Sequence, residues 1–163
     1  MKTRILFLFM TFCVAGMIHA QDTPVKNQKE KTHSSSTSDL IASKHFEFIP
    51  HVVFPTGMPP KDISADNYSI RFDEDEIISE MPYFGTARGG SLFGKDTGMR
   101  FRGKPEKFHS TTSNNKNNVT VKVKTSKDSF TLSLEVSESG LAVLTISSSN
   151  RQSISYQGEL RNF

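Results

Sequence analysis

The fold of this chain is decided by residues 119–136, which read VTVKVKTSKDSFTLSLEV. In both halves of this stretch every second residue is valine, leucine or phenylalanine, and the residues between are threonine, serine, lysine or glutamate. A period of two places alternate side chains on opposite faces of a β-strand. The stretch therefore predicts two antiparallel strands with one apolar and one solvent-facing side, joined by the polar residues 125–129.

The same signal continues toward the C-terminus. Residues 137–140, SESG, suit a tight turn in which Gly140 takes a positive φ. A strand over 141–146 follows, and a last strand carries Ile154 and Tyr156. Together with the first two, these strands predict a four-stranded up-and-down meander.

Earlier in the chain the strand signals are shorter and more often interrupted. Short strands are predicted at 68–72, 77–84 and 99–101, with the acidic run 73–76 at a solvated hairpin tip. The polar residues 109–118, which contain four asparagines, are predicted to form a mobile loop.

A strand and a short helix are predicted at the N-terminal end of the domain. Alternation indicates the strand, at Phe46, Phe48, Pro50, Val52 and Phe54. Because Pro50 lacks a backbone N–H, this is expected to be an edge or irregular strand. Ser38 or Asp39 is suited to cap a helix that runs to about Lys44.

These patterns predict a mainly β fold, all-β to α+β, with one antiparallel domain over residues 40–163. A sheet with one apolar face must cover that face. The meander and the earlier strands could form a strongly curved sheet, a sandwich, or a barrel with an internal cavity, and the short helix would be a minor cover. A helix-rich fold is disfavoured because no long stretch keeps a helical period.

The first twenty residues have the pattern of a secretory signal peptide. Lys2 and Arg4 precede an apolar stretch at 5–18, and the small Ala20 marks the expected cleavage point. Residues 1–20 are therefore predicted to direct export to the periplasm or cell surface, or secretion, and the polar residues 21–39 to form a flexible leader. Cleavage removes Cys13, so we expect no disulfide and no thiol chemistry afterwards.

Charge and hydropathy narrow the classes of partner. The net charge of +3 falls to +1 when Lys2 and Arg4 are removed, which gives no support for nucleic-acid binding. No second apolar stretch approaches the length of a membrane span. A series of lysines follows the strands of the C-terminal third, at Lys104, Lys107, Lys116, Lys122, Lys124 and Lys127. They could meet anionic glycans or lipid headgroups, but lysines that protect a sheet from edge-to-edge aggregation are the preferred interpretation.

The most conspicuous local cluster is Met81-Pro82-Tyr83-Phe84-Gly85. It could form the rim of a ligand pocket, or it could be an edge strand that delivers Tyr83 and Phe84 to the core. The Gly-rich segment that follows lacks the spacing of a phosphate-binding loop. If that segment closes over a ligand, Arg88 and Lys95 would favour an anionic group.

No catalytic constellation stands out in the sequence. The histidines at 33, 45, 51 and 109 lack metal-ligand spacing, and no G-x-S-x-G motif is present. We therefore predict no catalytic residue, no metal and no cofactor, and a protein that is not an enzyme.

Four motifs carry a resemblance to a known family: residues 68–70, 81–85, 140–142 and 149–158, of which the last is the most specific. They resemble domain of unknown function 4251, a family of exported Bacteroidetes proteins, over about residues 40–160, with Met81 where leucine is expected. The resemblance implies a mainly β protein of the bacterial envelope or a secreted one, and it supplies no ligand. Within the last motif, Arg151 could hydrogen-bond the 81–85 segment and fix a small site, or Asn150 could take a left-handed turn conformation while Arg151 packs on the surface.

Two functional hypotheses follow. The first is a non-enzymatic binding or interaction module whose partner is an envelope protein or a glycan. The alternative is a carrier that encloses a small apolar ligand within the curved sheet. A ligand or interaction surface is predicted at Met81, Tyr83, Phe84, Arg88 and Arg151.

Overall fold

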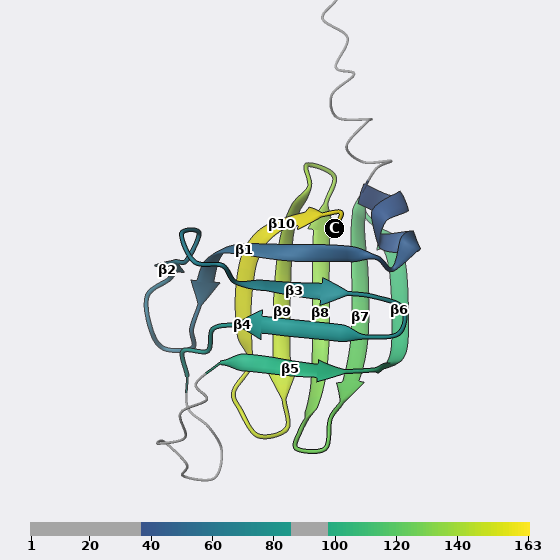
Figure 1. Ribbon diagram of the computed structural model, residues 1–163. Helices are drawn as coiled ribbons and strands as arrows, with labels where there is room; N and C mark the ends of the chain where they lie inside the picture. The colour runs from purple at the N-terminus through teal and green to yellow at the C-terminus, as the bar shows by residue number, and fades with distance from the viewer. Residues whose placement is uncertain (1–36, 86–97) are drawn as a thin grey trace, which may run out of the picture.

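A computed structural model describes residues 37–85 and 98–163 of the chain (Figure 1). The predicted signal peptide, most of the predicted leader, and Arg88 with Lys95 lie outside the described residues. The strands are β1 (Phe46–Phe54), β2 (Lys61–Asp62), β3 (Ser69–Phe72), β4 (Ile77–Met81), β5 (Met99–Gly103), β6 (Pro105–Ser113), β7 (Lys116–Lys124), β8 (Ser129–Ser137), β9 (Leu141–Ser148) and β10 (Ile154–Arg161). A short helix spans 37–43.

All of these strands belong to one antiparallel sheet. Its order is β5-β4-β3-β1-β10-β9-β8-β7-β6, and β2 pairs with β1. Strands β1, β3, β4 and β5 form a front layer that crosses the back layer, β6 to β10, at a steep angle (Figure 1). The predicted mainly β fold and the meander β7-β8-β9-β10 are confirmed, and the curved sheet is a nearly closed barrel.

Apolar side chains fill the space between the two layers. Phe46 and Phe72 stack with their ring centroids 4.6 Å apart on neighbouring strands of the front layer. Phe101 of β5 and Phe130 of β8 stack at 4.0 Å and join the front layer to the back. The alternation seen in the sequence is the cause, because alternate residues of each strand are buried.

The helix covers one end of the barrel. Ile41 is only 3% exposed and belongs to the core, while Asn117 Nδ2 of β7 donates a hydrogen bond to Ser38 Oγ at 3.3 Å. The helix ends at Lys44, whose φ of 54° is left-handed and whose N–H bonds the carbonyl of Ile41. The short helix expected from the sequence is thus confirmed, but the predicted cap is wrong, because the helix already includes Thr37 and both Ser38 and Asp39 lie within it.

The loop predicted at 109–118 is wrong. These residues form the end of β6 and the start of β7, joined by a turn at Asn114 and Asn115 with φ of 51° and 61°. Asparagine tolerates the left-handed conformation, and two such residues make the tight turn typical of a hairpin. The strand was hidden because most residues of β6 are polar on both faces.

The edge position predicted for the strand at 46–54 is also wrong, although its irregularity is confirmed. β1 lies between β3 and β10, and its register with β10 shifts between Pro50 and Val52. On the other side, β3 pairs only with 46–48 and β2 only with 52–53. On the side of β1 that faces β2 and β3, Pro50 therefore has no partner residue. Its missing N–H removes no hydrogen bond of the sheet on that side.

A close approach between backbones makes Gly158 of β10 irreplaceable. A Cβ added to Gly158 would lie 1.9 Å from the carbonyl oxygen of Ile49 and 2.9 Å from the Cα of Pro50. Both are backbone atoms of β1, so neither can move away as a flexible side chain would. We expect Gly158→Ala to lower the free energy of unfolding by about 3 kcal/mol, the upper end of ordinary overpacking, in urea denaturation of the protein.

Gly140→Ala is the matched control for this substitution. Gly140 has a φ of 83° and open space around its Cα, so alanine there meets only the left-handed strain of about 1–2 kcal/mol. A Gly158→Ala protein that is no less stable than Gly140→Ala would contradict the close approach.

Candidate functional site

The cluster predicted from the sequence lies at the end of the barrel where β9 turns into β10. The guanidinium of Arg151 lies over the ring of Tyr83, 5.4 Å from its centroid, and donates a hydrogen bond to the carbonyl oxygen of Gly98. The backbone N–H of Gln152 donates to the hydroxyl of Tyr83 at 3.1 Å. These contacts join the β9–β10 turn of the back layer to the ends of β4 and β5 in the front layer.

Neither of the predicted alternatives for Asn150 and Arg151 is found as stated, and a small site at Arg151 stays a prediction. Arg151 contacts the 81–85 segment through the ring of Tyr83, while its hydrogen bond goes to Gly98. Asn150 is not in a left-handed conformation, so that expectation is wrong. Instead its side chain bonds the carbonyl of Lys127 at 3.3 Å, which ties together two turns at this end of the barrel.

The other predicted site residues have different surroundings. Met81 is fully buried opposite Met99 and contributes to the core rather than to a surface. Phe84 is partly buried, and the ammonium of Lys61 lies 4.6 Å from its ring centroid. Arg88 lies outside the described residues. The ligand role assigned to these residues stays a prediction.

Tyr156 holds the segment before Tyr83 in place from within the core. Its hydroxyl is buried and donates to the carbonyl oxygen of Pro82 at 2.5 Å. Burial raises the pKa of Tyr156 far above its ordinary value of 10.0; the nearby Tyr83 adds to the rise and Arg151 opposes it. Tyr156 therefore remains a neutral hydrogen-bond donor and holds the chain just before Tyr83.

A second group of residues surrounds an open groove beside the helix. The helix and the β8–β9 turn lie at the end of the barrel opposite the β9–β10 turn (Figure 1). The groove has a volume of about 900 Å³. We call it the rim groove; its walls come from the helix, β1, the β8–β9 turn and the end of β10. The residues that give it chemical character are Asp39, Leu40, His51, Leu141, Glu159 and Leu160.

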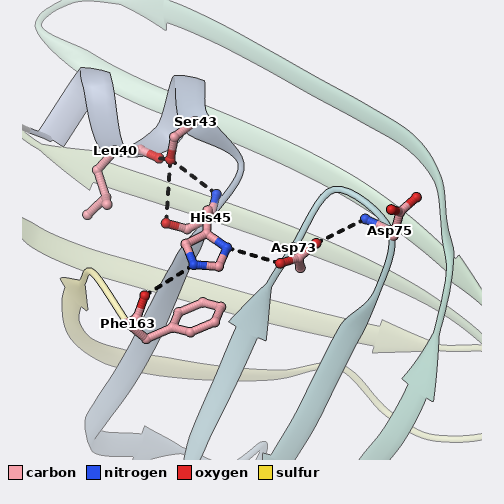
Figure 2. Close-up of polar contacts among 6 residues, drawn as sticks. All are labelled: Leu40, Ser43, His45, Asp73, Asp75 and Phe163. Carbon is pink, nitrogen blue, oxygen red and sulfur yellow. Dashed lines mark hydrogen bonds and ion pairs between the residues drawn. The ribbon is translucent and has the colours of Figure 1, made fainter.

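A hydrogen-bonded network around His45 fixes one wall of the rim groove (Figure 2). His45 Nδ1 is 3.0 Å from a carboxylate oxygen of Asp73, and Nε2 is 3.1 Å from the carbonyl oxygen of Phe163. The ring of Phe163 packs on the imidazole at 4.1 Å. Ser43 Oγ donates to the carbonyl of Leu40 and accepts from the N–H of His45. The helix, the β3–β4 turn and the last residues are thus held together.

Asp73 is suited to its place in this network as an ionised carboxylate. Its pKa is lowered, first by the hydrogen bond that it accepts from the backbone N–H of Asp75 at 3.2 Å, and then by the hydrogen bond from His45. The acidic run that forms the turn thus presents a fixed negative charge to the imidazole.

The rim groove places acceptors beside apolar surface. Leu141 is 47% exposed and Val143, on the same face of β9, is 37% exposed, so apolar surface continues out of the groove. Glu159 lies 3.9 Å from His51 and also binds Arg161.

Within residues 37–85 and 98–163, no three histidine, cysteine or acidic side chains are grouped as a metal site. No helix in the same part of the chain is long and apolar enough to cross a membrane.

Sequence reasoning missed the rim groove, although one signal for it was present. The strand at 141–146 reads LAVLTI, which has apolar residues in both phases of the alternation. Ala142 and Leu144 are buried, so the out-of-phase Leu141 and Val143 must face outward. His45 and Asp73 carried no such signal, because only the folded chain brings them together.

The architecture places the protein in the class of antiparallel β-barrels. The barrel is nearly closed, its core is filled, and a short helix lies over one end. The chain belongs to the family described as domain of unknown function 4251 (DUF4251), whose pattern matches residues 28–160. It is similar in fold to the crystal structure of a DUF4251 family protein from Bacteroides eggerthii, with a TM-score of 0.61 and 11% identity over 80% of this chain and 88% of that one. No curated protein matches the chain.

Removing the hydroxyl of Tyr156 tests the anchor. Tyr156→Phe leaves the carbonyl of Pro82 without its donor, so we expect a loss of about 1–2 kcal/mol in the free energy of unfolding at pH 7. Because the folded-state pKa is raised, the neutral phenol stabilises the fold fully below about pH 10, and this contribution is lost as pH rises and the unfolded state ionises. The variant should therefore lose less stability than the wild type between about pH 9 and pH 11, measured by urea denaturation.

Ile146→Val is a control of similar cost, about 1 kcal/mol, that keeps the hydroxyl. It should retain the full alkaline loss of the wild type. If Tyr156→Phe and Ile146→Val lose stability equally with rising pH, Tyr156 is not the buried titrating group.

Proposed function

We propose that this protein is an exported, non-enzymatic interaction module of the bacterial envelope, which binds its partner in the rim groove. The observation that carries the proposal is the groove of about 900 Å³, in which the exposed Leu141 and the half-buried Leu40 and Leu160 lie beside carboxylates. Concave sites that combine apolar surface with a few placed polar groups are typical of binding sites.

The lining of the rim groove favours a partner segment that carries both an apolar side chain and a hydrogen-bond donor. Leu40, Leu141 and Leu160 offer a surface for an apolar side chain. Asp39 and Glu159 place acceptors on the same walls, which suits a lysine, an arginine or another donor. A peptide segment of an envelope protein supplies both kinds of group, and we favour it over a glycan for this reason.

The alternative, a carrier of a small apolar ligand, has less support. The interior that such a ligand would need is occupied by large, fully buried side chains, among them Phe46, Phe72, Leu132 and Tyr156. Admitting a ligand would require these side chains to separate, at the cost of their packing. An apolar molecule released from the purified protein and detected by mass spectrometry would favour the carrier instead.

Export rests on the signal-peptide pattern of residues 1–20. Expression of the full chain in a Bacteroides host should yield a protein that begins at or near Gln21, recovered from the envelope or the medium. N-terminal sequencing of each cell fraction measures this. A cytoplasmic protein that retains Lys2 and Arg4 would overturn the export proposal and leave the groove proposal to its own test.

The rim groove is tested by placing a photo-crosslinking residue at Leu141. Leu141 and Met58 are equally exposed, at 47% and 49%, but Met58 lies outside the groove in the β1–β2 turn. We expect the Leu141 probe to capture a defined envelope protein that the Met58 probe does not. The captured protein, once purified, should bind Leu141→Glu at least about tenfold more weakly than wild type, since burial of a leucine contributes about 1.5–3 kcal/mol.

Met58→Glu is the matched control for the affinity measurement and should bind as the wild type does. Equal weakening by both substitutions would mean that charge, rather than the groove, governs binding. Capture by both probes, or affinity unchanged by Leu141→Glu, would contradict the proposal.

A further inference from the structure

Strand β6 is one end of the sheet and presents a free edge. Its residues pair with β7, and β6 terminates the strand order. Among the described residues, no backbone hydrogen bond joins β6 to any other element. Seven of its nine side chains, including every one from His109 to Ser113, are exposed. Such an edge is a template for another strand.

The turn at 114–115 determines which backbone groups of β6 point outward. In a hairpin with two turn residues, the flanking pair, here Ser113 and Lys116, exchanges both of its hydrogen bonds. Alternate residues of β6 then bond β7, and those between them direct their N–H and C=O groups to the free edge. The outward set is Phe108, Ser110 and Thr112.

This outward set is symmetric about Ser110. If a second β6 approaches antiparallel, Ser110 lies opposite Ser110 of the second copy, and Phe108 lies opposite Thr112 on both sides. Every outward donor then meets an outward acceptor. We propose that the protein forms a two-fold symmetric dimer in which β6 pairs with β6 of a second copy and the sheet continues across the interface.

The distribution of charge supports a second copy as the occupant. Residues 108–113, FHSTTS, contain no acidic residue, lysine or arginine, so no like charges face each other in this register. Lys107 would lie opposite Ser113. Of the lysine series that was expected to protect an edge, Lys107 lies on β6 itself, whereas Lys116, Lys122 and Lys124 lie on β7, inside the sheet.

The opposite end of the sheet is less suited to pairing. β5 is only five residues long, and its Arg100 and Arg102 form ion pairs with Glu80 of β4 and with Glu76, which directly precedes β4. Its neighbour Gly98 already accepts the hydrogen bond of Arg151. Of the two ends of the sheet, β6 therefore offers the longer template, and its residues 108–113 carry no acidic residue, lysine or arginine.

Charge substitution at Ser110 tests the dimer. In sedimentation equilibrium of residues 21–163 at up to a few hundred micromolar, the wild type should be a dimer. Ser110→Lys and Ser110→Glu each place like charges opposite each other at the two-fold axis, and each should weaken dimerisation at least tenfold. An equimolar mixture of the two variants should restore it, because the charges are then complementary. Ser133→Lys, on the exposed face of the inner strand β8, should dimerise as the wild type does.

A cysteine at the same position reports the register directly. The opposing residues of a hydrogen-bonded pair have Cα atoms about 5.5 Å apart, within the range of about 4.4–6.8 Å that a disulfide spans. Residues 21–163 contain no cysteine. With oxidised glutathione as the oxidant, two Ser110→Cys thiols should lose two electrons and two protons to form an intermolecular disulfide, and Ser133→Cys should not.

A wild type that is monomeric at a few hundred micromolar overturns the proposal. Dimerisation that is unchanged by Ser110→Lys, or cross-linking of Ser110→Cys that is no faster than that of Ser133→Cys, places any dimer interface elsewhere and also overturns it. None of these outcomes bears on the rim groove, which is tested through Leu141.

Discussion

The ladder between β1 and β10 is the constraint on which the rest of this fold depends. Among the strands of residues 37–85 and 98–163, it is the one pairing that joins the front layer to the back layer. Its register brings Pro50 opposite Gly158, and the backbones approach so closely there that only glycine fits. The irregular register beside Pro50 lets β1 leave the direction of the back layer, since a bulge bends and twists the strand that carries it.

Once this ladder has formed, the core and both ends of the barrel follow from it. The front layer lies across the meander, so Phe101 meets Phe130 and closes the interior. At one end, Arg151 and Tyr156 bind segments that follow or precede front strands. At the other end, His45 of the front layer bonds Phe163, which follows β10. Each contact joins residues far apart in sequence, and each is possible only in the register that Gly158 permits.

The sequence predicts those parts of the fold that local patterns encode. The meander was predicted because each strand carries its own alternation and each turn its own glycine or polar residues. β6 was missed because its side chains are mostly polar and exposed, so no buried face imposes an alternation. The central place of β1 was missed because the sequence of a strand does not identify its pairing partners. The same limit applies to the sites. A contact between Arg151 and the 81–85 segment was one of two predicted alternatives, whereas the rim groove, which is assembled from four separate elements, was not predicted.

Because side chains fill the interior, the proposed binding surfaces lie at the periphery of the barrel. The rim groove and the free edge of β6 are connected through the helix. Thr112 of β6 donates to the side-chain carbonyl of Asn117 at 2.8 Å, and the amide of Asn117 donates to Ser38 of the helix. The same helix supplies Asp39 and Leu40 to the rim groove. In the proposed dimer, Thr112 is fixed by the strand of the second copy. This chain of hydrogen bonds therefore joins the proposed dimer edge to the helix that forms one wall of the rim groove, so both proposed surfaces depend on the position of the same helix.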